Sequence, residues 1–137
     1  IRDITVQNLR LMDVRFPVLI QLNWFPQYSY GDQSNLSDKP EHWRKLADGV
    51  EGEAGLTAVS GLTIKNMTAH RSDNKYFSRA FFIEGYPERP VIGLTLEGIF
   101  IDASEFGKIS GVDGLRFQNV QVTAVENTQD CNDSYER

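Results

Sequence analysis

Side chains able to bind or cleave a substrate are spread thinly along this sequence of 137 residues. It holds 19 acidic and 14 basic residues, a net charge of −5, with two histidines and one cysteine. A structural zinc site takes about four nitrogen or sulfur ligands, more than two histidines and one cysteine supply, so we expect no metal site. We expect no cofactor either. The negative charge argues against nucleic acid or an anionic membrane surface as the main partner, and no apolar run approaches the roughly 20 residues that cross a bilayer.

A segment that recurs four times indicates which elements position the polar side chains. Its copies begin at residues 3, 61, 93 and 114, and each has apolar residues at an anchor position and two, five and seven residues later. Steps of two are typical of a β-strand, whereas the step of three requires a bend at which the inward face changes. Asn and Gly, which tolerate a left-handed backbone, occupy that bend. The bend positions are Asn8, Asn66, Gly98 and Asn119.

A third strand follows each of the first three copies, at residues 17–22, 80–85 and 107–111. Three strands per repeat predict an all-β fold, a right-handed parallel β-helix of about four coils over residues 1–125. A long loop insertion occupies residues 23–58, and a polar C-terminal tail occupies residues 126–137. Stacked bends predict a ladder of Asn side chains, interrupted at Gly98. The alternative is a leucine-rich repeat, whose single strand and near-constant length fit less well.

Alternation along the third strands supplies the candidate binding residues, because every second side chain points outward. The outward positions are Leu19, Gln21, Phe82, Glu84, Lys108 and Ser110. Trp24 and Trp43 of the insertion are further candidates, since a flat ring offers a large apolar contact area with a polar edge. Arg79, like Arg15 and Arg89, lies in a turn near this face and can bind a carboxylate through two hydrogen bonds. The alternative for the outward positions is an ordinary solvated sheet face. The alternative for the tryptophans is a mini-core within the loop, and that for the arginines is a set of surface salt bridges.

No catalytic residues are predicted within the chain. General acid–base catalysis needs an acid and a base placed together across one cleft, and here the carboxylates are scattered. Glu84 is the only carboxylate expected on the outward face of a third strand, and Asp102 flanks a turn, where carboxylates usually cap backbone amides. His42 and His70 have no evident ligand partner, so we expect them to be solvated or to cap backbone groups.

Residues 1–20 and 83–101 resemble the C-terminal coils of polygalacturonase-like enzymes, glycoside hydrolase family 28. The resemblance implies a right-handed parallel β-helix in an extracellular or periplasmic enzyme that cleaves pectic polysaccharide with inversion. The family's catalytic Asn-x-Asp, Asp-Asp, Gly-His-Gly and Arg-x-Lys motifs do not occur in this sequence. The chain is therefore expected to supply scaffold and distal sugar subsites, with the catalytic aspartates upstream of residue 1, and to be inactive alone.

The alternative function is a non-catalytic β-helix module, such as a carbohydrate-binding, adhesin or tail-spike-like segment. The expected partner is a polysaccharide or oligosaccharide, pectic if the resemblance holds. A second partner is expected at the N-terminal face, because residues 1–11 form the first two strands of a coil with no polar cap ahead of them. Preceding β-helix coils or a second copy of the chain would cover that face.

Overall fold

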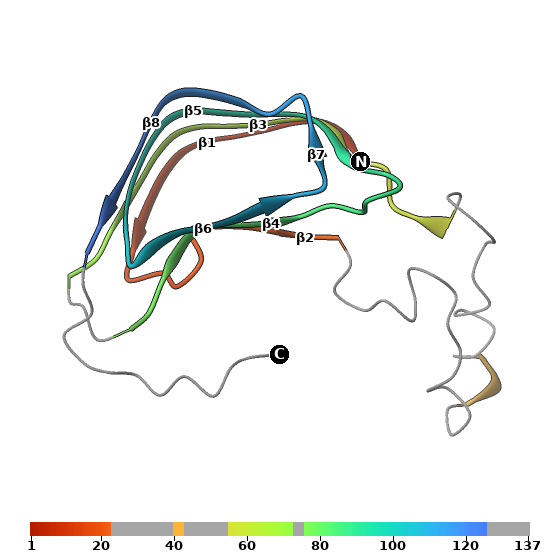
Figure 1. Cartoon of the computed structure of the whole chain (residues 1–137), viewed down its shortest axis with the longest axis horizontal. Coiled ribbons are helices and arrows are strands. Elements are labelled where there is room, and N and C mark those ends of the chain that lie inside the picture. Colours follow the sequence, from red (N-terminus) through yellow and green to blue (C-terminus); the bar gives the residue numbers. More distant parts are fainter. Residues whose placement is uncertain (23–39, 43–54, 73–75, 126–137) are drawn as a thin grey trace.

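The computed structural model describes residues 1–22, 40–42, 55–72 and 76–125, and these form an all-β structure. Its strands are β1 (Arg2–Met12), β2 (Val18–Gln21), β3 (Ser60–His70), β4 (Arg79–Glu84), β5 (Val91–Ala103), β6 (Glu105–Ser110), β7 (Val112–Asp113) and β8 (Arg116–Ala124). They build two parallel sheets, one in the order β1-β3-β5-β7 with β8 also paired to β5, the other in the order β2-β4-β6 (Figure 1). The prediction of an all-β fold is confirmed, with parallel sheets. None of the described segments forms a helix with the length and hydropathy of a membrane span.

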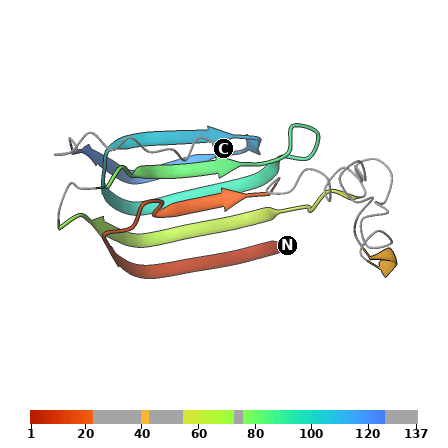
Figure 2. The same ribbon diagram turned by 90° about the horizontal axis from the view of Figure 1, so that it is seen from below.

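The copies of the sequence repeat lie side by side in register (Figure 2). One apolar column pairs Leu9 with Met67, Met67 with Ile99, and Ile99 with Val120. Every pairing is parallel, so equivalent residues of successive copies stand next to each other. The alignment made from apolar spacing alone therefore also gives the strand register.

The long strands bend at the predicted position. Asn8 has a φ of 60° and Asn66 a φ of 53°, and Gly98 and Asn119 are left-handed too. The structure differs in one respect, because each predicted pair of strands is one continuous bent strand in β1, β3 and β5 (Figure 1). Pairing resumes directly after the bend, so at this corner a single residue of each strand leaves the ladder.

A second column of left-handed residues precedes the anchor positions, and the sequence interpretation did not include it. It consists of Asp3, Gly61, Gly93 and Gly114. Val91 and Leu94 are both fully buried although they are three residues apart, so the inward face changes here as it does at the Asn corner. A column that is mostly glycine is consistent with this backbone, since glycine adopts a positive φ without steric cost.

The hydrophobic core lies between the two sheets and is most complete in the middle strands. Phe81 and Ile83 of β4, together with Leu94 and Ile99 of β5, are 0% exposed. Equivalent residues of the outer strands, such as Leu9, are only partly buried. The central strands thus bury the largest share of apolar area, which is the main favourable contribution to folding.

Paired serines fix the turns that lead into β4 and β6. The backbone N–H of Ser78 donates to Oγ of Ser104 at 3.0 Å, and the N–H of Ser104 donates to Oγ of Ser78 at 3.1 Å. Ser78 is only 2% exposed, so this exchange satisfies polar groups that water reaches poorly. It positions the starts of two strands that carry candidate binding residues.

Candidate functional site

The outward side of the second sheet holds most of the candidate binding residues. Leu19 pairs with Phe82 and Phe82 with Lys108, while Gln21 pairs with Glu84 and Glu84 with Ser110. We call this surface the β2–β4–β6 face; its residues are Leu19, Gln21, Phe82, Glu84, Lys108 and Ser110. The alternation predicted from the sequence is confirmed, because Phe81 and Ile83, which flank Phe82 in the chain, are fully buried.

Three polar side chains on this face form one connected group. Nζ of Lys108 donates to Oε1 of Glu84 at 2.6 Å, and Nε2 of Gln21 donates to Oε2 of Glu84 at 3.4 Å. The Glu84 side chain is 26% exposed and that of Lys108 is 58% exposed. Both carboxylate oxygens thus have a partner but keep lone pairs, and Lys108 keeps further N–H donors for a ligand.

An apolar platform adjoins the polar group. Leu19 is 55% exposed, and the ring of Phe16 meets the ring of Phe82 edge to face with centroids 5.9 Å apart. Phe16 precedes β2 and was not among the predicted binding residues, because only the folded chain brings it beside Phe82. An apolar surface next to hydrogen-bonding groups suits the two sides of a sugar ring.

The arginines near this face contact other residues of the chain. Nε of Arg79 lies 2.5 Å from Oε1 of Glu105, and its guanidinium carbon lies 5.2 Å from the ring centre of Phe77. Arg15 stacks 5.4 Å from the ring centre of Tyr76, and Nη1 of Arg89 donates to the carbonyl of Leu56 at 2.9 Å. The structure therefore favours the salt-bridge alternative for Arg79.

The partner of Arg79 reveals an incorrect strand boundary. The predicted third strand began at Gly107, whereas β6 begins at Glu105 and pairs there with Arg79. In the sequence Gly107 has the character of a turn residue, but it lies inside β6, where its φ is 92°. A Cβ atom at Gly107 would overlap the carbonyl oxygen of Phe81, so the close approach of β4 excludes other residues.

His70 and Asp102 form a pair that the sequence interpretation excluded. Nδ1 of His70 lies 2.9 Å from Oδ2 of Asp102, so the expectation that His70 has no partner is wrong. The two residues are 32 positions apart in the chain, and only the parallel register of β3 and β5 brings them together. They lie on the long sheet beyond the Asn corner, away from the β2–β4–β6 face.

Two candidates cannot be placed, and known proteins add no comparison. Trp24 and Trp43 lie outside the described residues, as do most of the insertion and the tail at residues 126–137. Within the described ranges, no group of three or more His, Cys, Asp or Glu side chains could hold a metal ion. No protein-family model, curated protein or solved structure matches the chain. Any function must therefore be argued from the geometry of its own side chains.

Proposed function

We propose that the chain is the C-terminal part of a right-handed parallel β-helix in a polygalacturonase-like glycoside hydrolase. Its role would be to supply scaffold and distal subsites for pectic oligosaccharide on the β2–β4–β6 face. Two features support the β-helix: the in-register stacking of the repeats and the hydrogen bond between the corner residues Asn8 and Asn66. Parallel crossover connections are right-handed in nearly all proteins, which supplies the proposed hand.

The observation that carries the proposed binding role is the combination of an apolar platform and a polar group on one face. The C–H side of a sugar ring would lie on Phe82 and Leu19. Glu84 and Gln21 would bind ring hydroxyls, and Lys108 would meet the carboxylate of a uronic acid. Neighbouring strands are about 4.8 Å apart, so these contacts fall within reach of one or two sugar residues.

The proposal assigns binding to this face and catalysis to aspartates on other coils of the parent protein. Inverting hydrolysis needs two carboxyl groups roughly 6.5 to 9.5 Å apart with a water molecule between them. Glu84 and Glu105 are the carboxylates of β2, β4 and β6, and both are in ion pairs. A carboxylate held by Lys108 on one oxygen and Gln21 on the other is better suited to bind hydroxyl groups than to transfer protons.

The same observation also favours a second candidate, a non-catalytic carbohydrate-binding module. The two candidates differ in the activity of the natural protein. In a hydrolase, replacing Lys108 with Gln should raise KM for long substrates with little change in kcat, because it removes binding far from the scissile bond. A binding module would show affinity for the polysaccharide and no turnover at all.

Calorimetric titration of the chain with trigalacturonate tests the proposed binding role. Lys108→Gln should weaken binding about ten- to a hundredfold, since a hydrogen bond to a charged group contributes roughly 1.5 to 3 kcal/mol. Lys65→Gln is the matched control, because Lys65 lies on β3 before the Asn corner, in the other sheet. Equal losses in the two variants, or no binding to the unaltered chain, would overturn the proposed role.

A further inference from the structure

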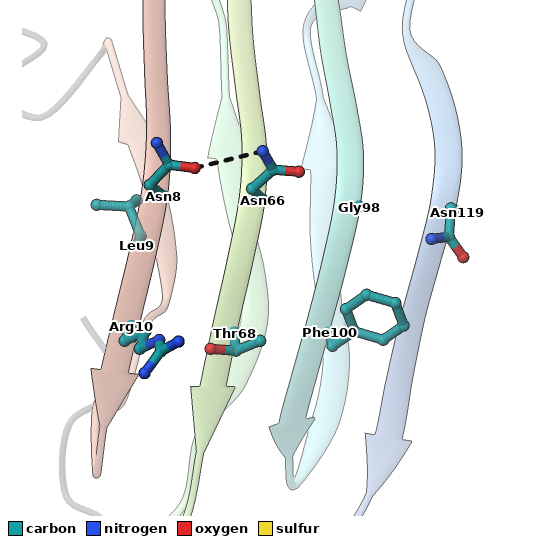
Figure 3. Close-up of a pocket in the computed structure, with 8 residues that line it drawn as sticks. All are labelled: Asn8, Leu9, Arg10, Asn66, Thr68, Gly98, Phe100 and Asn119. Atoms are coloured by element: carbon teal, nitrogen blue, oxygen red, sulfur yellow. Dashed lines mark hydrogen bonds between the residues drawn. The ribbon is translucent and has the colours of Figure 1, made fainter.

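A second surface with binding features lies on the long sheet just beyond the Asn corner (Figure 3). A hollow of about 410 Å³ runs over the corner, and a second hollow of about 460 Å³ adjoins it toward the strand ends. Arg10 and Thr68 line both hollows, so the two lie next to each other. We call this surface the corner trough; the residues used below are Arg10, Asn66, Thr68, Gly98, Phe100 and Asn119. Each hollow has the size of a small-ligand site, roughly 300 to 1,000 Å³.

The side-chain oxygen of Asn66 and the side-chain amide of Asn119 line the upper part of the trough. Nδ2 of Asn66 donates to Oδ1 of Asn8 at 3.3 Å, but the ladder stops at Gly98, which has no side chain (Figure 3). A Cβ atom at Gly98 would lie 3.3 Å from Oδ1 of Asn66, so this oxygen faces the gap. Asn119 stands on the other side of the gap, and its side chain makes no hydrogen bond to the residues that the structure describes. Both groups can therefore bind the hydroxyls of a ligand.

Arg10 supplies an available positive charge. Its side chain is exposed and leans from β1 toward Thr68 (Figure 3). Among the described parts of the chain, Arg10 has no ion pair and no side-chain hydrogen bond, whereas Arg79 pairs with Glu105 and Arg89 donates to the carbonyl of Leu56. Its planar guanidinium matches a carboxylate in two parallel hydrogen bonds.

Phe100 supplies an apolar surface in the same row. Arg10 pairs with Thr68, and Thr68 pairs with Phe100, so the small threonine separates the guanidinium from the ring. Phe100 is 39% exposed, although its neighbours Ile99 and Ile101 are almost completely buried. Desolvating an exposed aromatic ring against the C–H face of a sugar is favourable.

We propose that the corner trough is a second saccharide site, specific for an acidic pyranose of the uronic acid class. The carboxylate would bind Arg10, the ring would lie against Phe100, and hydroxyls would bind Asn66 and Asn119. This inference rests on the trough alone and stands whether or not the β2–β4–β6 face binds sugar. If both sites bind, one polysaccharide that reaches both would be held more tightly than by either, because the second contact becomes intramolecular.

An amide-detected NMR titration of the whole chain with trigalacturonate tests this site, because it separates the two surfaces. Signals of residues 66–68, 98–100 and 119–121 should shift, and Arg10→Gln should raise the dissociation constant measured from them about tenfold. Arg116→Gln is the matched control, since Arg116 lies on β8 of the same sheet but before the corner. It should leave those values unchanged.

Further variants and ligands in the same titration can contradict the proposal. Phe100→Ser should also weaken binding, whereas Ile92→Ser should not, because Ile92 is exposed on the same strand but outside the trough. A trisaccharide whose carboxylates are reduced to alcohols should bind weakly to the trough. Equal binding of that neutral sugar, equal effects of Arg10→Gln and Arg116→Gln, or shifts confined to the β2–β4–β6 face would each overturn the proposal. Shifts caused equally by acetate would reduce the trough to a non-specific anion contact and would overturn it as well.

Discussion

The side-chain nitrogen of Asn66 lies 3.3 Å from the side-chain oxygen of Asn8, which stands 58 residues earlier in the chain. Both residues have a left-handed backbone, with φ values of 53° and 60°. Asparagine thus has two functions at this corner, because it tolerates the positive φ and its amide links one repeat to the next. The bond also shows how a repeat with insertions of very different length still stacks in register.

Replacing Asn66 should separate these two functions. Asn66→Gly keeps an easy left-handed backbone and loses the hydrogen bond, which contributes about 0.5 to 1.5 kcal/mol. Asn66→Ala also adds the cost of a left-handed residue with a Cβ atom, roughly 1 to 2 kcal/mol. We therefore expect the alanine variant to be the less stable of the two in urea unfolding. A glycine variant that unfolds first would contradict this account of the corner.

The corner could be predicted because the spacing of the apolar residues shows which side chains face the core. Ile64 and Met67 both lie in the hydrophobic core although they are three residues apart, which a straight strand cannot achieve. The second left-handed column was missed because the apolar columns begin only after it. Nothing in the spacing distinguished Gly61 or Gly93 from ordinary turn residues.

Side-chain pairs were harder to predict than backbone positions. Lys108 and Glu84 are 24 residues apart, and His70 and Asp102 are 32 apart, so each pair forms only through strand register. The outward direction of Glu84 followed from alternation, but its partner depended on the rotamers of long side chains. The same reason explains why the sequence left two alternatives for Arg79, a ligand contact or a salt bridge, whereas the fold pairs it with Glu105.

Burying a charge in the middle of the stack should unfold it. Ile99 is 0% exposed, and an unpaired buried carboxylate costs several kcal/mol against a total stability of about 5 to 15 kcal/mol. Ile99→Asp should therefore lack a cooperative thermal transition by circular dichroism. Phe100→Asp, one residue further on and exposed, should melt close to the unaltered chain. Similar melting of both variants would show that Ile99 does not face the core.

The 137-residue chain alone should not release reducing ends from polygalacturonan or rhamnogalacturonan. Glu84 and Glu105, the carboxylates of β2, β4 and β6, are both in ion pairs, so these three strands offer no free acid and base for inversion. A reducing-sugar assay over several hours checks this. Turnover that disappears in Glu84→Gln would contradict the assignment of this face to binding.

The edge of the long sheet should promote association. Ile4 is 41% exposed and Val6 is 37% exposed on β1, which stands at the end of its sheet. An unpaired strand edge with apolar side chains can pair with a strand of another copy. Sedimentation of the chain alone should therefore show dimers or larger species. Val6→Lys should shift the population toward monomer, and Thr5→Lys, on the outward side of β1, should not. A monodisperse monomer of the unaltered chain would refute this prediction.

The most direct test of the proposed sugar-binding face is the contact between Phe82 and a bound sugar. Intermolecular nuclear Overhauser effects can be measured on the folded chain with saturating trigalacturonate. The account predicts effects between the ring protons of Phe82 and the ring protons of the sugar. It predicts none for Phe81, which is fully buried and serves as an internal control. A sugar that binds the chain without any such effect at Phe82 would contradict the central claim.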